Sequence, residues 1–170
     1  MTLMGRTIDN LKSAFAGESQ ANRKYLAFAK KADEEDQPQV AKLFRAAAEA
    51  ETIHALNHLK AMGEVKGTEE NLGSAVSGET YEFKEMYPGF IEAAKAEKNT
   101  QAAWSFDVAN RVEKVHAELY RQAEKSLKSG EKMPVKDYYV CSVCGMTVEG
   151  DAPDKCPICG APKAKFFKVF

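Results

Sequence analysis

Apolar side chains recur every three or four residues along the first 130 positions of the chain, which is the spacing of amphipathic helices. The pattern predicts four helices, at about residues 7–35, 38–62, 68–97 and 99–130. Thr7 and Asn99 are suitable N-caps for the first and fourth helices. Pro38 suits the first position of the second helix, and Gly63 suits its end.

Four helices of this length, joined by short or moderate loops, predict an all-α four-helix bundle. The third helix is expected to kink at Pro88-Gly89. A linker containing Gly130 and Pro134 then leads into a segment of different composition, which holds every cysteine of the chain. We therefore expect a helical domain over residues 1–132 and a small metal-knuckle domain with short β-strands over residues 133–170.

Charged residues interrupt the apolar pattern at positions that suit metal binding. Glu18 follows Leu11 by seven residues and precedes Tyr25 by seven, so it lies on the buried side of the first helix. A carboxylate there is costly unless it is paired or bound to metal. In the second helix, Glu51 and His54 are three residues apart and share one helix face.

The same arrangement returns in the second half of the chain, which indicates an internal repeat of one helical hairpin. Glu79 takes the place of Glu18, and Glu113 with His116 repeats the Glu-x-x-His spacing sixty-two residues later. A pseudo-two-fold arrangement of the hairpins brings four carboxylates and two imidazoles together, the ligand set of ferritin-like di-iron proteins. These ligands suit iron or manganese better than zinc, and iron is the expected metal.

The two halves differ at one informative position. Glu82 lies three residues after the lone glutamate of the second half, whereas Ala21 stands at the corresponding place in the first half. We hypothesise that Glu82 binds an iron in the oxidised state and releases it on reduction, because a fifth carboxylate balances the higher charge. Tyr25 and Tyr87 follow the lone glutamates by seven and eight residues. Each is either a hydrogen-bond partner of a ligand carboxylate or a core aromatic.

The four cysteines form two near-identical Cys-x-x-Cys-Gly knuckles, with Cys141, Cys144, Cys156 and Cys159 as the sulfur donors. Four thiolates make a tetrahedral site, and ligand spacing alone does not choose between zinc and a single iron. A neighbouring di-iron site favours iron, which would relay single electrons to it. The alternative is a zinc ribbon that only folds this part of the chain.

Charge and hydropathy exclude two classes of partner. The 24 basic and 25 acidic residues are well mixed and give a formal net charge of −1, so no basic patch for nucleic acid or anionic membrane is expected. The first residues lack the features of a secretory signal, and no segment offers about eighteen consecutive apolar residues. We expect a cytoplasmic protein whose cysteines bind metal instead of forming disulfides.

With these motifs together, the chain resembles rubrerythrins, which join a ferritin-like di-iron domain to a C-terminal rubredoxin-like domain. The resemblance runs from Thr7 to Phe170 and includes the Cys-Pro-x-Cys-Gly form of the second knuckle. It implies a di-iron centre whose ligands are Glu18, Glu51, His54, Glu79, Glu82, Glu113 and His116. It also implies an Fe(Cys)4 site whose ligands are Cys141, Cys144, Cys156 and Cys159. In the family one iron exchanges a glutamate for a histidine when its redox state changes, and the matching positions are Glu82 and His54. Tyr25 and Tyr87 match tyrosines that lie beside the family's iron ligands.

The resemblance also implies a function. It implies a peroxidase that reduces hydrogen peroxide to water in defence against oxidative stress, with Glu82, His54, Tyr25 and Tyr87 taking part in the chemistry. Electrons would come from NAD(P)H through a reductase and a rubredoxin. The resemblance further implies a homodimer or larger assembly, and some family members exchange helix pairs between subunits.

Two other functions are compatible with parts of the pattern. One is a ferritin-like ferroxidase that stores iron, and the other is a redox-inactive scaffold stapled by zinc. The fused four-cysteine segment and the additional Glu82 argue against iron storage.

Overall fold

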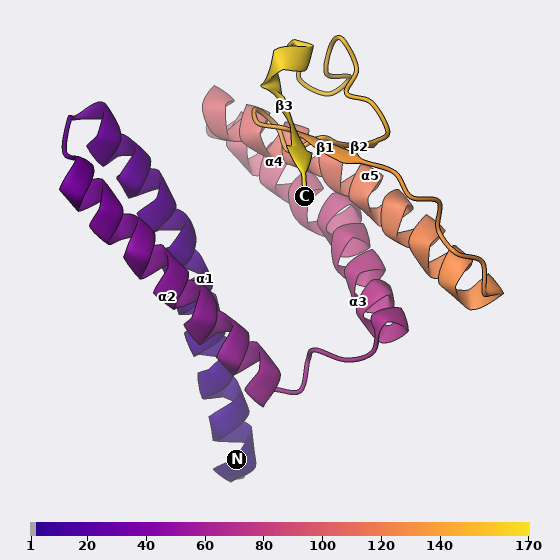
Figure 1. The fold of residues 1–170 in the computed structure, drawn as a ribbon, viewed down its shortest axis with the longest axis horizontal. Coiled ribbons are helices and arrows are strands. Elements are labelled where there is room, and N and C mark those ends of the chain that lie inside the picture. Colours follow the sequence, from indigo (N-terminus) through magenta and orange to yellow (C-terminus); the bar gives the residue numbers. More distant parts are fainter. Residues whose placement is uncertain (1–2) are drawn as a thin grey trace. The chain divides into compact units, whose positions relative to one another are not determined.

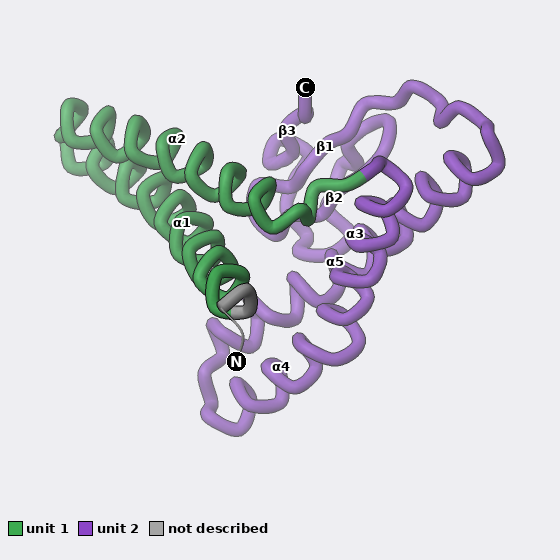
Figure 2. The backbone as a smooth tube through the Cα atoms, turned by 90° about the horizontal axis from the view of Figure 1, so that it is seen from below, with its two compact units in different colours: residues 1–66 green, residues 67–170 purple. Residues whose placement is uncertain are grey.

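The helical part of the chain consists of two helix pairs that belong to different compact units. The computed structural model describes the backbone of residues 3–170 and the side chains of residues 6–170, so residues 1 and 2 of the expected helical domain lie outside it. Unit 1 extends to Lys66, and unit 2 runs from Gly67 to Phe170 (Figure 2). Unit 2 therefore holds both the second helix pair and the four-cysteine segment. The division into domains at residues 132 and 133 stays a prediction.

Unit 1 is a hairpin of two long helices, α1 (Leu3–Glu34) and α2 (Pro38–Ala61), which pack side by side (Figure 1). Helix α2 begins with Pro38 and is followed by Gly63 in the left-handed conformation (φ 71°), as predicted. The prediction of Thr7 as N-cap is wrong, because α1 already begins at Leu3. Threonine is a weaker N-cap than serine, aspartate or asparagine and can also continue a helix, so Thr7 does not fix where the helix starts.

Small residues form the contact between α1 and α2. Ala29, Ala32, Ala41, Ala48 and Ala55 are buried, so the two backbones come close together. Several larger apolar residues of both helices remain exposed, and they include Leu26, Phe28, Leu43, Ile53 and Leu56. Unit 1 therefore presents an apolar surface that its own two helices do not cover.

The second helix pair contains a local departure from α-helical geometry. Helix α3 (Thr68–Tyr81) continues into a π-helical turn, η1 (Glu82–Met86), and then into α4 (Tyr87–Ala96). The expected irregularity thus lies just before Pro88, not at Pro88-Gly89. Proline has no N–H to donate, so the regular α-helical bonding cannot continue through this turn. The N–H of Tyr87 instead donates to the carbonyl of Glu82, five residues back.

The partner of this interrupted helix is α5 (Thr100–Ser129), whose ends follow the prediction. The Asn99 Oδ1 accepts a hydrogen bond of 3.0 Å from the Ala102 N–H, and Gly130 ends the helix in the left-handed conformation (φ 72°). Charged residues occur along the whole helix. Among the residues that the structure describes, no helix combines the length and apolar character needed to cross a membrane.

The cysteine-rich segment folds as a small three-stranded antiparallel sheet, which we call the cysteine module (residues 138–170). Its strands are β1 (Tyr138–Cys141), β2 (Thr147–Glu149) and β3 (Phe166–Val169), in the order β2-β1-β3. Its buried core comprises Cys141, Met146 and Cys156, and Val112 of α5 belongs to the same cluster. The predicted class, mostly helical with a small metal-knuckle domain of short strands, is confirmed.

One buried polar residue connects the two helices of unit 1 and provides a test of this packing. The Asn22 Nδ2 donates to the Ala48 carbonyl (2.7 Å) and to the Thr52 hydroxyl (2.8 Å) across the helix pair. We expect Asn22→Ala to lower the free energy of unfolding of the metal-free protein by about 1–3 kcal/mol, because it removes buried hydrogen bonds. Denaturant unfolding followed by circular dichroism measures the change. Gln20→Ala, at an exposed position of the same helix, is the control, and equal midpoints for the two variants would contradict the assignment.

Candidate metal centres

The first cluster of metal-ligand types lies in unit 1 and joins α1 to α2. Glu18, Glu51 and His54 each present one donor atom, and these atoms lie within 4.8 Å of one another. The His54 Nδ1 is 2.9 Å from the Glu51 Oε2, so Nδ1 is the ring nitrogen on the carboxylate side. The His54 side chain is 54% exposed, whereas that of Glu51 is 18% exposed. The helix spacing thus brings the three predicted residues together.

The second cluster lies in unit 2 and repeats this geometry between α3 and α5. Donor atoms of Glu79, Glu113 and His116 lie within 4.8 Å of one another. The His116 Nδ1 is 2.6 Å from the Glu113 Oε2, and the His116 side chain is 26% exposed. Both clusters therefore offer two carboxylates and one Nδ1 atom, which are donors that suit iron.

Crowding of carboxyl groups shifts the protonation of the second cluster. Burial, a hydrogen bond to Glu113 and the Glu113 charge raise the pKa of Glu79 to about 7. Burial also opposes ionisation of Glu113, but its hydrogen bond to His116 and the charge of that ring outweigh burial and lower the pKa of Glu113. The same hydrogen bond raises the pKa of His116, although burial opposes it. Without a metal, the cluster therefore retains protons near neutral pH.

Glu82 begins the π-helical turn and lies next to this cluster. Burial is the main cause that raises the pKa of Glu82, and the charge of Glu113 adds to it, while His116 opposes the shift. Burial also raises the pKa of Tyr87, and the charges of Glu82, Glu113 and Glu79 act in the same direction. The carboxylates and the Tyr87 hydroxyl thus share one electrostatic environment.

The π-helical turn accounts for the different spacing of the two tyrosines. Each tyrosine belongs to a three-ring aromatic cluster, one formed by Tyr25, Phe28 and Phe44 and the other by Tyr87, Phe90 and Phe106. The ring centroids are 5.6–6.3 Å apart in the first cluster and 5.5–6.3 Å apart in the second. Because a π-turn absorbs one extra residue, the second cluster is restored although its tyrosine lies eight residues after the lone glutamate instead of seven. The spacing of seven against eight was a sequence signal of this insertion.

The four cysteines form a compact site in the cysteine module. Their sulfurs lie within 4.8 Å of one another, with Cys141 and Cys159 at 3.7 Å and Cys144 and Cys156 at 3.6 Å. Around a tetrahedral metal with metal–sulfur bonds of about 2.3 Å, neighbouring sulfurs are about 3.8 Å apart. The separations therefore fit a single tetrahedral ion.

Backbone conformation and backbone hydrogen bonds in the knuckles favour a thiolate at Cys156. Gly145 and Gly160, which follow the second cysteine of each knuckle, adopt positive φ angles of 82° and 77°. Burial opposes ionisation of Cys156, but backbone hydrogen bonds from Cys159 and Ile158 contribute to lowering its pKa to about 7. Cys156 therefore ionises more readily than an ordinary thiol, which favours metal binding as a thiolate.

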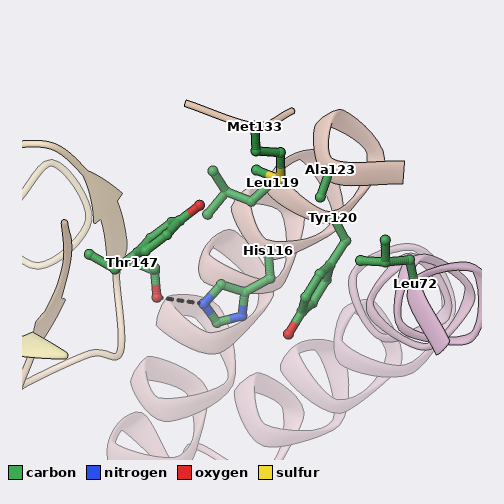
Figure 3. A pocket seen from close by; sticks show the side chains of 8 residues that line it. Leu72, His116, Leu119, Tyr120, Ala123, Met133 and Thr147 are labelled. Carbon is green, nitrogen blue, oxygen red and sulfur yellow. Dashed lines mark hydrogen bonds between the residues drawn. The ribbon is translucent and has the colours of Figure 1, made fainter. Parts of the chain in front are cut away.

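The cysteine module packs directly on α5 within unit 2. The Arg111 side chain donates to the backbone carbonyls of Ile158 (3.0 Å) and Pro157 (3.2 Å) in the second knuckle. Val112 is 2% exposed, and Gly145 of the first knuckle approaches it closely. One turn further along α5, the His116 Nε2 lies 2.9 Å from the Thr147 hydroxyl (Figure 3). The sequence singles out neither Arg111 nor Thr147, because no local pattern marks contacts across 31–47 residues.

Comparisons with known proteins agree with both parts of this arrangement. The family model for rubrerythrin matches residues 9–124, and the model for the rubrerythrin rubredoxin-like domain matches residues 139–167. The chain belongs to the rubrerythrin family. Rubrerythrin-2 of Clostridium acetobutylicum is 36% identical over 94% of this chain and 95% of its own length. Nigerythrin of Nitratidesulfovibrio vulgaris is 38% identical over 97% of this chain and 87% of its own length.

A solved structure of nigerythrin in its fully reduced, all-ferrous state is also similar, with 37% identity and a TM-score of 0.58. The match covers 96% of this chain and 86% of the nigerythrin chain. Membership in the rubrerythrin family confirms iron as the metal of a binuclear site and of an Fe(Cys)4 site. The assignment of individual residues to the irons stays a proposal, which the two carboxylate–histidine clusters and the four sulfurs support.

The protonation of the second cluster predicts how metal binding to this rubrerythrin depends on pH. The raised pKa values of Glu79, at about 7, and of His116 mean that both hold protons at pH 6 in the metal-free protein. An ion must displace these protons, so the affinity for Mn²⁺ should rise between pH 6 and pH 8. Titration calorimetry in buffers of different ionisation enthalpy measures both the affinity and the protons released. Glu85→Gln, an exposed position of η1, should keep this dependence, and an affinity that stays constant over the range would contradict the prediction.

Proposed function

We propose that this protein is a peroxidase that reduces hydrogen peroxide to water at a binuclear iron centre. We assign its iron ligands to the residues of the two carboxylate–histidine clusters. Electrons come from NAD(P)H through a reductase and a rubredoxin-type donor, and they enter through the Fe(Cys)4 site. The observation that carries the proposal is Glu82, the additional carboxylate on the π-helical turn beside Glu113 and His116.

Glu82 supports a redox role because it breaks the symmetry of the repeat. The regular helix α1 has Ala21 at the corresponding place, so only one half of the centre carries a fifth carboxylate. The other half offers His54, whose side chain is about twice as exposed as that of His116, at 54% against 26%. We infer that Glu82 binds iron in the oxidised state and that His54 replaces it on reduction.

The chain also provides a proton-carrying group next to the centre. Two ferrous ions supply the two electrons that, with two protons, convert one hydrogen peroxide into two waters. The Tyr87 hydroxyl lies in the field of the neighbouring carboxylates and retains its proton, because burial and these charges raise its pKa. We therefore assign Tyr87 to holding a proton beside the reacting oxygen atoms.

The docking of the cysteine module supports an electron route within one chain. Arg111 holds the second knuckle through two carbonyl groups, and Val112 packs into the core that contains Cys141 and Cys156. Val112 directly precedes Glu113 in α5, so the residues that contact the knuckles adjoin a residue of the second cluster. The short path along α5 favours transfer to the iron at Glu113 and His116 of the same chain.

A substitution of Glu82 tests the peroxidase assignment. We expect the reduced parent protein to react with hydrogen peroxide much faster than with dioxygen. Glu82→Gln should slow the peroxide reaction about tenfold or more, because a neutral amide cannot supply the negative charge that balances the oxidised irons. Stopped-flow absorption of the diferrous protein measures both reactions, and Glu85→Gln is the matched control from the same π-helical turn.

The same measurements separate the peroxidase from an iron-storage protein. A storage ferroxidase would consume dioxygen faster than peroxide and would accumulate many irons per chain. Equal peroxide rates for Glu82→Gln and the parent protein would show that Glu82 has no redox role.

The electron route is tested by loosening the contact between α5 and the cysteine module. Arg111→Ala removes both hydrogen bonds to the second knuckle, so oxidation of the reduced Fe(Cys)4 iron by added peroxide should become several-fold slower. The visible absorption of this iron reports the rate, and Lys114→Ala, an exposed neighbour on α5, is the control. The route is contradicted if Arg111→Ala and the parent protein reoxidise at the same rate.

A further inference from the structure

A single side-chain contact connects the cysteine module to a predicted iron ligand. Thr147 is the first residue of β2 and follows the first knuckle by two residues. Its hydroxyl lies 2.9 Å from the His116 Nε2 and 3.2 Å from the Gly145 carbonyl oxygen (Figure 3). The contact joins residues that are 31 positions apart, and both belong to unit 2.

The geometry of the imidazole determines which atom donates this bond. In the metal-free protein the His116 Nδ1 lies 2.6 Å from the Glu113 carboxylate and donates its N–H to it, so an ion bound beside Glu113 would take the place of this proton and meet the lone pair of Nδ1. The Nε2 of the same ring must then carry the proton of the neutral imidazole. The Thr147 hydroxyl accepts this N–H and donates its own hydrogen to the Gly145 carbonyl. The hydroxyl thus selects the tautomer that binds metal through Nδ1.

A neighbouring cavity makes this contact important for the orientation of the ring. The cavity has a volume of about 330 Å³, and its lining includes His116, Thr147, Tyr138 and Met133. The lining is mainly apolar, with Leu119 and Ala123 of α5 also contributing. The imidazole therefore borders open space, and the Thr147 hydroxyl is the polar group that fixes its Nε2 side.

In the part of the chain that the structure describes, the other half of the repeat has no hydroxyl contact of this kind. There the His54 ring contacts the Glu51 carboxylate through the ring nitrogen Nδ1. The His54 side chain is also more exposed than that of His116. The contact with the cysteine module therefore fixes the ring of His116, whereas the ring of His54 is freer to move.

We propose that Thr147 is a positioning residue for His116, so that the cysteine module of the chain completes the second metal cluster. This inference rests on the proposed role of His116 as a metal ligand. It gives the module a second role besides electron transfer, since its folding and docking set the geometry of the binuclear centre. Without the Thr147 hydroxyl, the His116 imidazole turns toward the cavity, and its Nδ1 binds the ion more weakly.

The test is Mn²⁺ binding by protein that retains iron in its four-cysteine site and has been stripped of metal elsewhere. Electron paramagnetic resonance measures free Mn²⁺ during the titration and needs no catalytic turnover. Thr147→Val keeps the shape of the side chain but removes the hydroxyl, and it should weaken binding of one Mn²⁺ by about 10- to 100-fold. Thr147→Ser restores the hydroxyl and should return the affinity close to that of the parent protein.

Two controls separate this inference from the proposed site and from general damage. His116→Ala should lose the same Mn²⁺; if it binds like the parent protein, His116 is not a ligand and the proposed site fails first. Tyr138→Phe removes a hydrogen bond to Glu149 in the same sheet and changes the same cavity, but leaves Thr147 in place. It should bind Mn²⁺ like the parent protein. If His116→Ala loses the ion while Thr147→Val binds normally, or if Thr147→Ser is as weak as Thr147→Val, the positioning role is overturned.

Discussion

Carboxylate groups that lie together between helices repel one another unless protons or cations neutralise them, and the helical part of this protein is arranged around that constraint. In the second cluster, Glu79 and Glu113 share a hydrogen bond, and the pKa of Glu79 rises to about 7. His116 then becomes a stronger base than a free imidazole, because it faces the same negative charge. Metal ions remove this repulsion, so a cluster that is unfavourable without metal becomes a binding site with it.

Each copy of the repeated hairpin provides one carboxylate–histidine cluster, and one residue inserted in the second copy makes the two copies unequal. Regular α-helix in α1 and the π-helical turn in the second pair lead to similar aromatic clusters, so the insertion leaves the surrounding packing intact. The turn begins at Glu82, which stands where the first half has Ala21 and which lies in the field of Glu113. A local defect in helix bonding thus coincides with the one additional carboxylate, as is common for π-turns at functional sites.

The docking of the cysteine module relates the fold to the proposed chemistry. A zinc-stapled scaffold would need the four sulfurs but would not need a contact between the module and a carboxylate–histidine cluster. Here Arg111 and Val112 hold the knuckles, and Thr147 reaches His116 one turn away on the same helix. An apolar interface, two charge-assisted hydrogen bonds and a hydroxyl contact together keep the module on α5. This arrangement favours a redox partnership of the two sites.

The sequence alone was enough to predict the helices, the repeated Glu-x-x-His pairs and the four-cysteine site, because all of these depend on short spacings along the chain. It misplaced the start of α1 at Thr7 and the helix irregularity at Pro88, because propensity and hydrogen bonding in neighbouring turns compete with single-residue signals. The contacts of Thr147 with His116 and of Arg111 with the second knuckle are visible only in the folded protein. These contacts join residues that are far apart in the chain, and packing of the module against α5, not local periodicity, brings them together.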